Sequence, residues 1–144
     1  MRLDAANELQ PDAMLRIEHP RGGRSCLDEA GYVQGAPELV AEVAASSASI
    51  DLRQKKRVYE RNGVQEYLVW QVFEQRLDWF CLREGEYGAL SPDAEGIVRS
   101  QVFPGLWLAA NELLGGNLQV VLQVLQRGMS TSECQQFVQR LAQA

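Results

Sequence analysis

A strand, a charged helix and a second strand follow one another in the middle of the chain, and this order constrains the fold most. The first strand, Glu38–Ala44, is apolar after its first residue except for Glu42, and the second strand, Glu66–Val72, is rich in aliphatic and aromatic residues. Between them, Ile50–Arg61 has the composition of a helix that stops at Asn62-Gly63. The pattern predicts an α/β domain built around a sheet.

Glu42 places a carboxylate inside the apolar run that covers residues 39–45. Burying a carboxylate is unfavourable unless a cation or a hydrogen-bond donor meets it. The position therefore predicts either a functional site or a local structural ion pair, and the residues of this strand alone favour neither.

The remaining elements are predicted from apolar periodicity and turn residues. We expect strands at 12–17, 77–82, 87–90 and 97–102, and helices at 109–114, 117–126 and 133–142. The segment 66–90 is typical of an antiparallel meander. Ser47 or Ser49 would cap the first helix, Gly128 would end the helix at 117–126, and Ser130 would begin a capping box for the last helix.

The composition is that of a soluble globular protein, because 46% of the 144 residues are hydrophobic and 23% are charged. We expect a single domain over residues 1–144, with a core at about 7–108 and a helical segment at about 109–144. No apolar stretch approaches the ~20 residues of a membrane span, and the N-terminus lacks a secretory signal, so we expect a cytoplasmic protein. The net charge of −5 argues against coating of nucleic acid through bulk charge.

Three side chains would meet if the predicted strands at 12–17 and 38–44 are neighbours in the sheet. Asp12 opens one strand and Glu42 lies in the other, while Lys55 shares a helix face with Asp51 and Tyr59 through its spacing of four residues from each. Two carboxylates suit Mg²⁺ or Mn²⁺, which would polarise a phosphoryl oxygen and activate a water. A lysine would stabilise the charge of the transition state or orient the water.

The same residues carry a resemblance to a known family. The segments concerned, in chain order, are Gln10-Pro11-Asp12, Gly35–Val43, Ser46-Ser47, Asp51–Lys55, Tyr59 and Gly63–Trp70. Together they resemble the Uma-two family of the PD-(D/E)XK nuclease superfamily over roughly Asn7 to Trp107. The resemblance implies a restriction-endonuclease-like α/β fold, with a mixed sheet flanked by helices and with C-terminal helices.

The resemblance also implies roles for individual residues. Asp12 matches the acid of the PD motif and Glu42 matches the acid of the (D/E)XK motif, so both would be ligands of Mg²⁺ or Mn²⁺. Ala44 stands where that motif has its lysine, and the resemblance implies that Lys55 takes its place, with Lys56 as the runner-up. Glu38 stands where the family often has Asp, and no role is assigned to it.

Relatives carry a helix and a strand before the PD motif, whereas eleven residues precede Asp12 here. Either the chain is truncated, or its start was assigned too late, or another chain supplies the missing layer. Loss of that segment would expose a sheet edge and one apolar face.

Two hypotheses of function follow. In the first, the chain is a Mg²⁺-dependent endonuclease that hydrolyses DNA, and the cations of the helix at 50–61 contact the phosphate backbone. In the alternative, it is a catalytically inactive, truncated nuclease-like domain that forms a homodimer or binds another partner, and those cations form a solvated helix face.

Overall fold

The protein is described here by a computed structural model, which covers residues 1–3, 8–45 and 49–144. The chain divides into an N-terminal unit, Met1–Gly88, and a C-terminal unit, Ala89–Ala144. The single domain that the sequence predicts stays a prediction. Ser47 and the side chain of Ser49, which were expected to cap the first helix, lie outside the described residues.

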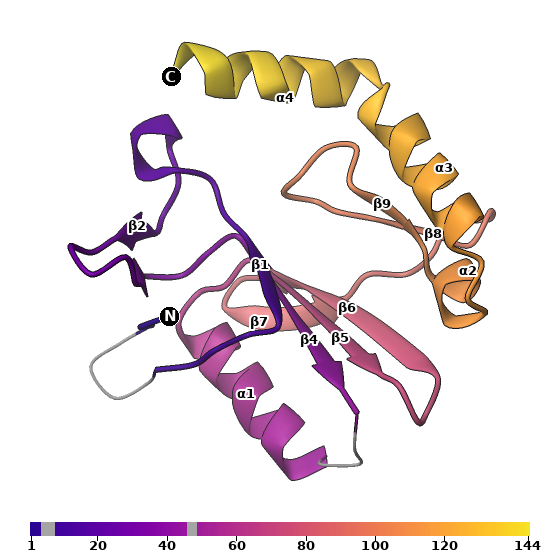
Figure 1. Ribbon diagram of the computed structural model, residues 1–144, viewed down its shortest axis with the longest axis horizontal. Helices are drawn as coiled ribbons and strands as arrows, with labels where there is room; N and C mark the ends of the chain where they lie inside the picture. The colour runs from indigo at the N-terminus through magenta and orange to yellow at the C-terminus, as the bar shows by residue number, and fades with distance from the viewer. Residues whose placement is uncertain (4–7, 46–48) are drawn as a thin grey trace. The chain divides into compact units, whose positions relative to one another are not determined.

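A mixed sheet forms the N-terminal unit, as the sequence predicts (Figure 1). Its order is β1-β4-β5-β6-β7. The strands are β1 (Ala13–Leu15), β4 (Leu39–Ala44), β5 (Glu66–Gln71), β6 (Arg76–Arg83) and β7 (Glu86–Ala89). β1 is antiparallel to β4, β4 is parallel to β5, and β5 is antiparallel to β6. The α-helix α1, Ser49–Arg61, connects the parallel pair.

A small hairpin lies between β1 and β4 in the sequence. It pairs β2 (Cys26–Leu27) with β3 (Val33–Gln34) and follows a single 3-10 turn, His19–Arg21. The buried Glu38 carboxylate fixes this connection to the start of β4, because it accepts hydrogen bonds from the amides of Ile17, at 2.8 Å, and Arg24, at 3.1 Å. Glu38 therefore has a structural role that the sequence left unassigned.

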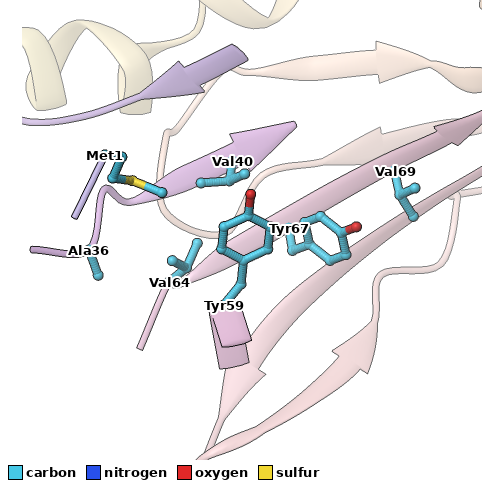
Figure 2. Close-up of a cluster of buried hydrophobic side chains, with 7 residues drawn as sticks. All are labelled: Met1, Ala36, Val40, Tyr59, Val64, Tyr67 and Val69. Atoms are coloured by element: carbon cyan, nitrogen blue, oxygen red, sulfur yellow. The ribbon is translucent and has the colours of Figure 1, made fainter. Parts of the chain in front are cut away.

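The core of the N-terminal unit lies between α1 and one face of the sheet. Figure 2 shows its buried side chains, which are Met1, Ala36, Val40, Tyr59, Val64, Tyr67 and Val69. The rings of Tyr59 on α1 and Tyr67 on β5 pack with their centroids 5.2 Å apart. On β4, Val40 and Glu42 face this core, whereas Val43 on the alternate face is 47% exposed.

The C-terminal unit contains a hairpin and three helices. Strand β8 (Ile97–Arg99) pairs with β9 (Trp107–Ala109), and α2 (Ala110–Leu114), α3 (Leu118–Met129) and α4 (Ser132–Gln143) follow. The predicted strand at 97–102 is thus too long. It ends early because the Ser100 hydroxyl accepts hydrogen bonds from the amides of Val102 and Phe103 and turns the chain.

Two expectations about the joint between α3 and α4 are wrong. Gly128 does not end α3, which continues to Met129. The cap of α4 is Thr131, whose hydroxyl accepts a hydrogen bond from the Cys134 amide at 3.3 Å, whereas the Ser130 hydroxyl donates back to the Gln126 carbonyl. None of the helices among the described residues is long and apolar enough to cross a membrane.

Close packing explains why Gly128 lies inside a helix. A methyl group there would clash with the Gly105 carbonyl oxygen and lie 2.7 Å from Cγ of Trp107. The residue is small because the hairpin loop packs directly against the helix backbone, and not because a helix terminus needs flexibility.

We expect Gly128→Ala to lower the free energy of unfolding by about 1–3 kcal/mol, because overpacking against a fixed backbone outweighs the better helix propensity of alanine. Urea denaturation followed by circular dichroism measures it. Gly88→Ala is the control, since a methyl group there meets nothing within 4 Å. Equal stability of the two variants would contradict the close-packing explanation.

Candidate functional site

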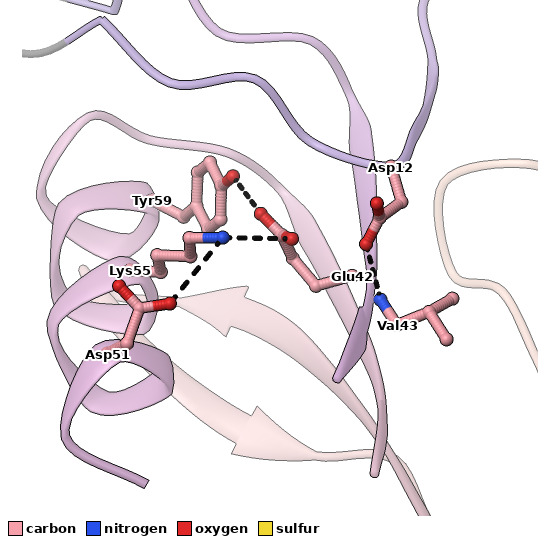
Figure 3. Close-up of polar contacts among 6 residues, drawn as sticks. All are labelled: Asp12, Glu42, Val43, Asp51, Lys55 and Tyr59. Carbon is pink, nitrogen blue, oxygen red and sulfur yellow. Dashed lines mark hydrogen bonds and ion pairs between the residues drawn. The ribbon is translucent and has the colours of Figure 1, made fainter. Parts of the chain in front are cut away.

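Two donors on α1 meet the Glu42 carboxylate, which is only 4% exposed (Figure 3). The Tyr59 hydroxyl donates a hydrogen bond to Oε1 at 2.6 Å, and Nζ of Lys55 lies 3.2 Å from Oε2. Lys55 also lies 3.7 Å from Oδ2 of Asp51, on the exposed side of the helix. A cation and a hydroxyl thus offset the burial of a carboxylate that would otherwise be strongly unfavourable.

The sequence builds this contact through two periodicities. Asp51, Lys55 and Tyr59 are four residues apart and form one stripe along α1. On β4, alternation turns Glu42 to the same face as Val40, the face that α1 covers. The parallel crossover from β4 through α1 to β5 therefore brings the stripe over the carboxylate.

Lys55 and Tyr59 keep their protons at neutral pH. Burial alone lowers the pKa of Lys55, but the hydrogen bond and charge of Glu42, with the charges of Asp51 and Asp12, outweigh it and raise the pKa above its ordinary value. Burial, followed by the hydrogen bond and charge of Glu42, raises the pKa of the Tyr59 hydroxyl well above its usual range. Both groups therefore remain donors to Glu42.

Asp12, the residue before β1, reaches the same place. Its Oδ2 accepts a hydrogen bond of 2.7 Å from the Val43 amide, next to Glu42 in β4. The antiparallel register pairs Ala13 with Ala41, which puts the residue before β1 beside Glu42. Asp12, Glu42 and Lys55 line one hollow of about 250 Å³, which we call the acidic hollow.

The structure distinguishes the two neighbouring lysines. Lys55 points to Glu42, whereas Nζ of Lys56 lies 3.6 Å from the centroid of the Phe80 ring. Only Lys55 of this pair belongs to the acidic hollow. The sequence did not assign a partner to Tyr59, although its spacing from Lys55 already placed it on the same helix face.

The donor set of the acidic hollow fits a hard divalent cation. Asp12, just before β1, and Glu42, in the neighbouring strand β4, supply carboxylate oxygens, and Asp51 lines the hollow from α1. Mg²⁺ commonly binds through one or two carboxylates and completes its shell with water and substrate phosphate. Among the described residues, no group of three or more His, Cys, Asp or Glu side chains is arranged to hold a metal ion, so the protein would supply few ligands.

Comparison with models of known protein families gives a match over most of the chain. The model of the Uma2 family, described as "Putative restriction endonuclease", matches residues 1–111, which is more than half of the chain and includes every residue of the acidic hollow. A search of curated proteins found none that matches.

We expect Tyr59→Phe to lower the free energy of unfolding by about 1–3 kcal/mol, because Oε1 of the buried Glu42 loses its donor. Urea denaturation at pH 7 measures the change. Tyr32→Phe is the matched control, since that tyrosine is 49% exposed and its hydroxyl can exchange a protein partner for water. A loss of the same size in both variants would refute a specific role of the Tyr59 hydrogen bond.

The same variant tests the raised pKa of Tyr59. An unfolded tyrosine titrates near its ordinary pKa of about 10, so the unfolded chain releases this proton first. The stability that the protonated hydroxyl contributes is therefore complete below about pH 10 and is lost as the pH rises above it. The free energy of unfolding should fall less steeply above pH 10 in Tyr59→Phe than in the parent, and an equally steep fall would contradict the assignment.

Proposed function

Because the chain belongs to the Uma2 family, whose fold is restriction-endonuclease-like, we propose that it is an endonuclease that hydrolyses DNA phosphodiester bonds with Mg²⁺ or Mn²⁺. The observation that carries the proposal is the buried Glu42 carboxylate, held by Lys55 and Tyr59 at a hollow that Asp12 also lines. An ion pair with a purely structural role would not require the second carboxylate, that of Asp12, beside it.

Asp12 and Glu42 are the residues that would hold the metal ion. When bound, the ion supplies a Lewis acid that polarises a phosphoryl oxygen and lowers the pKa of a coordinated water. The carboxylates are oriented by donors of the protein: the Val43 amide holds Oδ2 of Asp12, the Tyr59 hydroxyl holds Oε1 of Glu42, and the Lys55 ammonium holds Oε2 of Glu42. Such partners orient ligands before binding, which reduces the entropy that binding must offset.

Lys55 would act as a fixed positive charge at the reacting phosphate. Its side chain is 26% exposed and lines the acidic hollow, so a phosphoryl group in that hollow can approach the ammonium. The raised pKa keeps Lys55 protonated, which suits charge stabilisation and not proton abstraction. In the free protein the same charge balances Glu42.

The homodimer and the cytoplasmic location that the sequence predicts stay predictions.

Calorimetric titration of Mn²⁺ tests the proposed ligands. We expect saturable binding to the parent chain and loss of binding in Asp12→Asn and in Glu42→Gln, because each replaces a charged ligand with a neutral amide. Glu86→Gln is the control, since it removes an exposed carboxylate at the start of β7, which does not line the acidic hollow. A folded parent that binds no Mn²⁺ would overturn the metal-dependent mechanism.

Lys55→Met separates catalysis from metal binding. We expect this variant to bind Mn²⁺ at least as tightly as the parent, because a cation that competes for Glu42 is gone. Cleavage of supercoiled plasmid should nevertheless slow by about 10²–10³-fold, the usual loss when a group that stabilises transition-state charge is removed. Cleavage at the parent rate would exclude Lys55 from the chemistry.

A further inference from the structure

A second hollow of about 230 Å³ lies beside α1 and shares Leu52 with the acidic hollow. Arg53 and Lys56 line it from α1, and Arg76 lines it from the start of β6. Asp78 is the one carboxylate among its lining residues, so three cations against one anion leave a net charge of +2. We call it the basic hollow.

The charges of the basic hollow are available to a ligand. Asp78 is already paired with Nε of Arg76 at 2.7 Å, so it does not neutralise the two cations on α1. Lys56 lies over the Phe80 ring, which fixes its ammonium at the wall and leaves donor hydrogens free. For Arg53, no ion pair with another described residue is present.

A buried hydroxyl adds an independent sign of a ligand. Tyr67 lines the basic hollow and is 1% exposed, yet its hydroxyl has no hydrogen-bond partner among the described residues. Figure 2 shows this hydroxyl pointing away from Tyr59 toward Val69, which lines the same hollow. A buried hydroxyl without a partner is unfavourable by about 1–3 kcal/mol and is rare in folded proteins. Burial raises its pKa, so it stays a donor.

We propose that the basic hollow binds a backbone phosphate of the nucleic-acid strand whose neighbouring phosphodiester occupies the acidic hollow. Guanidinium, ammonium and hydroxyl groups are all donors that suit phosphate oxygens. In naming DNA as the ligand, the inference rests on the proposed function. It goes beyond that function in assigning a second phosphate position and the residues that hold it.

Two observations favour a strand over a free anion. The two hollows share the lining residue Leu52 and therefore adjoin one another along α1, an arrangement that suits two phosphates of one strand better than a single small anion. The positive surface also continues along α1, where Arg53 and Lys56 line a further hollow together with Arg57 and Glu60. An extended row of cations is the footprint of a polyanion, whereas a single anion needs one cluster.

The test measures DNA binding without chemistry. A fluorescently labelled short DNA duplex is titrated with protein in EDTA at several salt concentrations, and binding is followed by anisotropy. We expect Arg53→Gln to weaken binding on the order of tenfold and to reduce the slope of log affinity against log salt by about 1. Arg83→Gln, at the opposite end of β6 from Arg76, removes the same charge outside the hollow and should bind within about twofold of the parent. Equal affinities of Arg53→Gln and Arg83→Gln would overturn the proposal.

Tyr67→Phe tests the hydroxyl without changing charge. We expect weaker DNA binding together with an unchanged or higher free energy of unfolding, because the hydroxyl has no partner to lose among the described residues of the free protein. A merely structural hydroxyl would give the reverse, namely lower stability with unchanged DNA affinity, and would remove Tyr67 from the phosphate site.

Two further measurements, of inorganic phosphate binding and of DNA cleavage, distinguish failure of the second phosphate position from failure of the proposed endonuclease activity. If inorganic phosphate binding depends on Arg53 while DNA binding does not, the hollow holds a free anion and the proposal is wrong. If DNA binding depends on Arg53 but no metal ion supports cleavage, the basic hollow stands and the proposed endonuclease activity fails. If cleavage requires Glu42 while the DNA affinity of Arg53→Gln equals that of the parent, the endonuclease activity stands and the second phosphate position is wrong.

Discussion

The burial of Glu42 is the constraint on which the N-terminal unit depends. A carboxylate in the middle of β4 faces the core, and removing its partners would leave a buried charge at a cost of several kcal/mol. α1 must therefore lie over β4 in the one register that brings both Lys55 and Tyr59 to the carboxylate. The ion pair thus ties the geometry of the strand–helix–strand crossover to the geometry of the candidate site.

Tyr59 connects this polar contact to the apolar core. Its ring packs against Tyr67, and Tyr67 in turn packs against Phe80 and Tyr87 on the next two strands. The same side chain therefore anchors α1 to the sheet and fixes one oxygen of Glu42. Because one residue serves both purposes, a change in the packing between α1 and β5 is expected to move the donor that holds Oε1 of Glu42.

The sequence predicted the elements whose patterns are local, and it failed where distant contacts decide. Alternation and helical spacing located β4, α1 and β5 within a residue or two, and they also put Lys55 on the face of α1 that meets Glu42. Gly128 looked like a helix end because its true reason for being glycine, the approach of Gly105, is separated from it by more than twenty residues.

Patterns in the sequence also fail to identify the partners of single side chains. The two amides that hold Glu38 come from a connection far from it in sequence, and no spacing rule could have named them. The early end of β8 is a different case, because the Ser100 hydroxyl that turns the chain accepts hydrogen bonds from amides only two and three residues away. For the candidate site, the sequence brought Asp12, Glu42 and Lys55 together, whereas the partner of each carboxylate oxygen required the structure.

The distribution of charge explains how an acidic chain can be suited to nucleic acid. The net charge is −5, yet α1 carries five cations within nine residues, Arg53–Arg61. Their positions around the helix divide them: Lys55 turns to the acidic hollow, while Arg53 and Lys56 turn to the basic hollow next to it. The net negative charge of the chain opposes contact with a polyanion, so we expect favourable contact at the cations of α1 and at Arg76, which lines the basic hollow with Arg53 and Lys56. A strand held there would place its phosphates beside Glu42 without any broad electrostatic attraction to the rest of the protein.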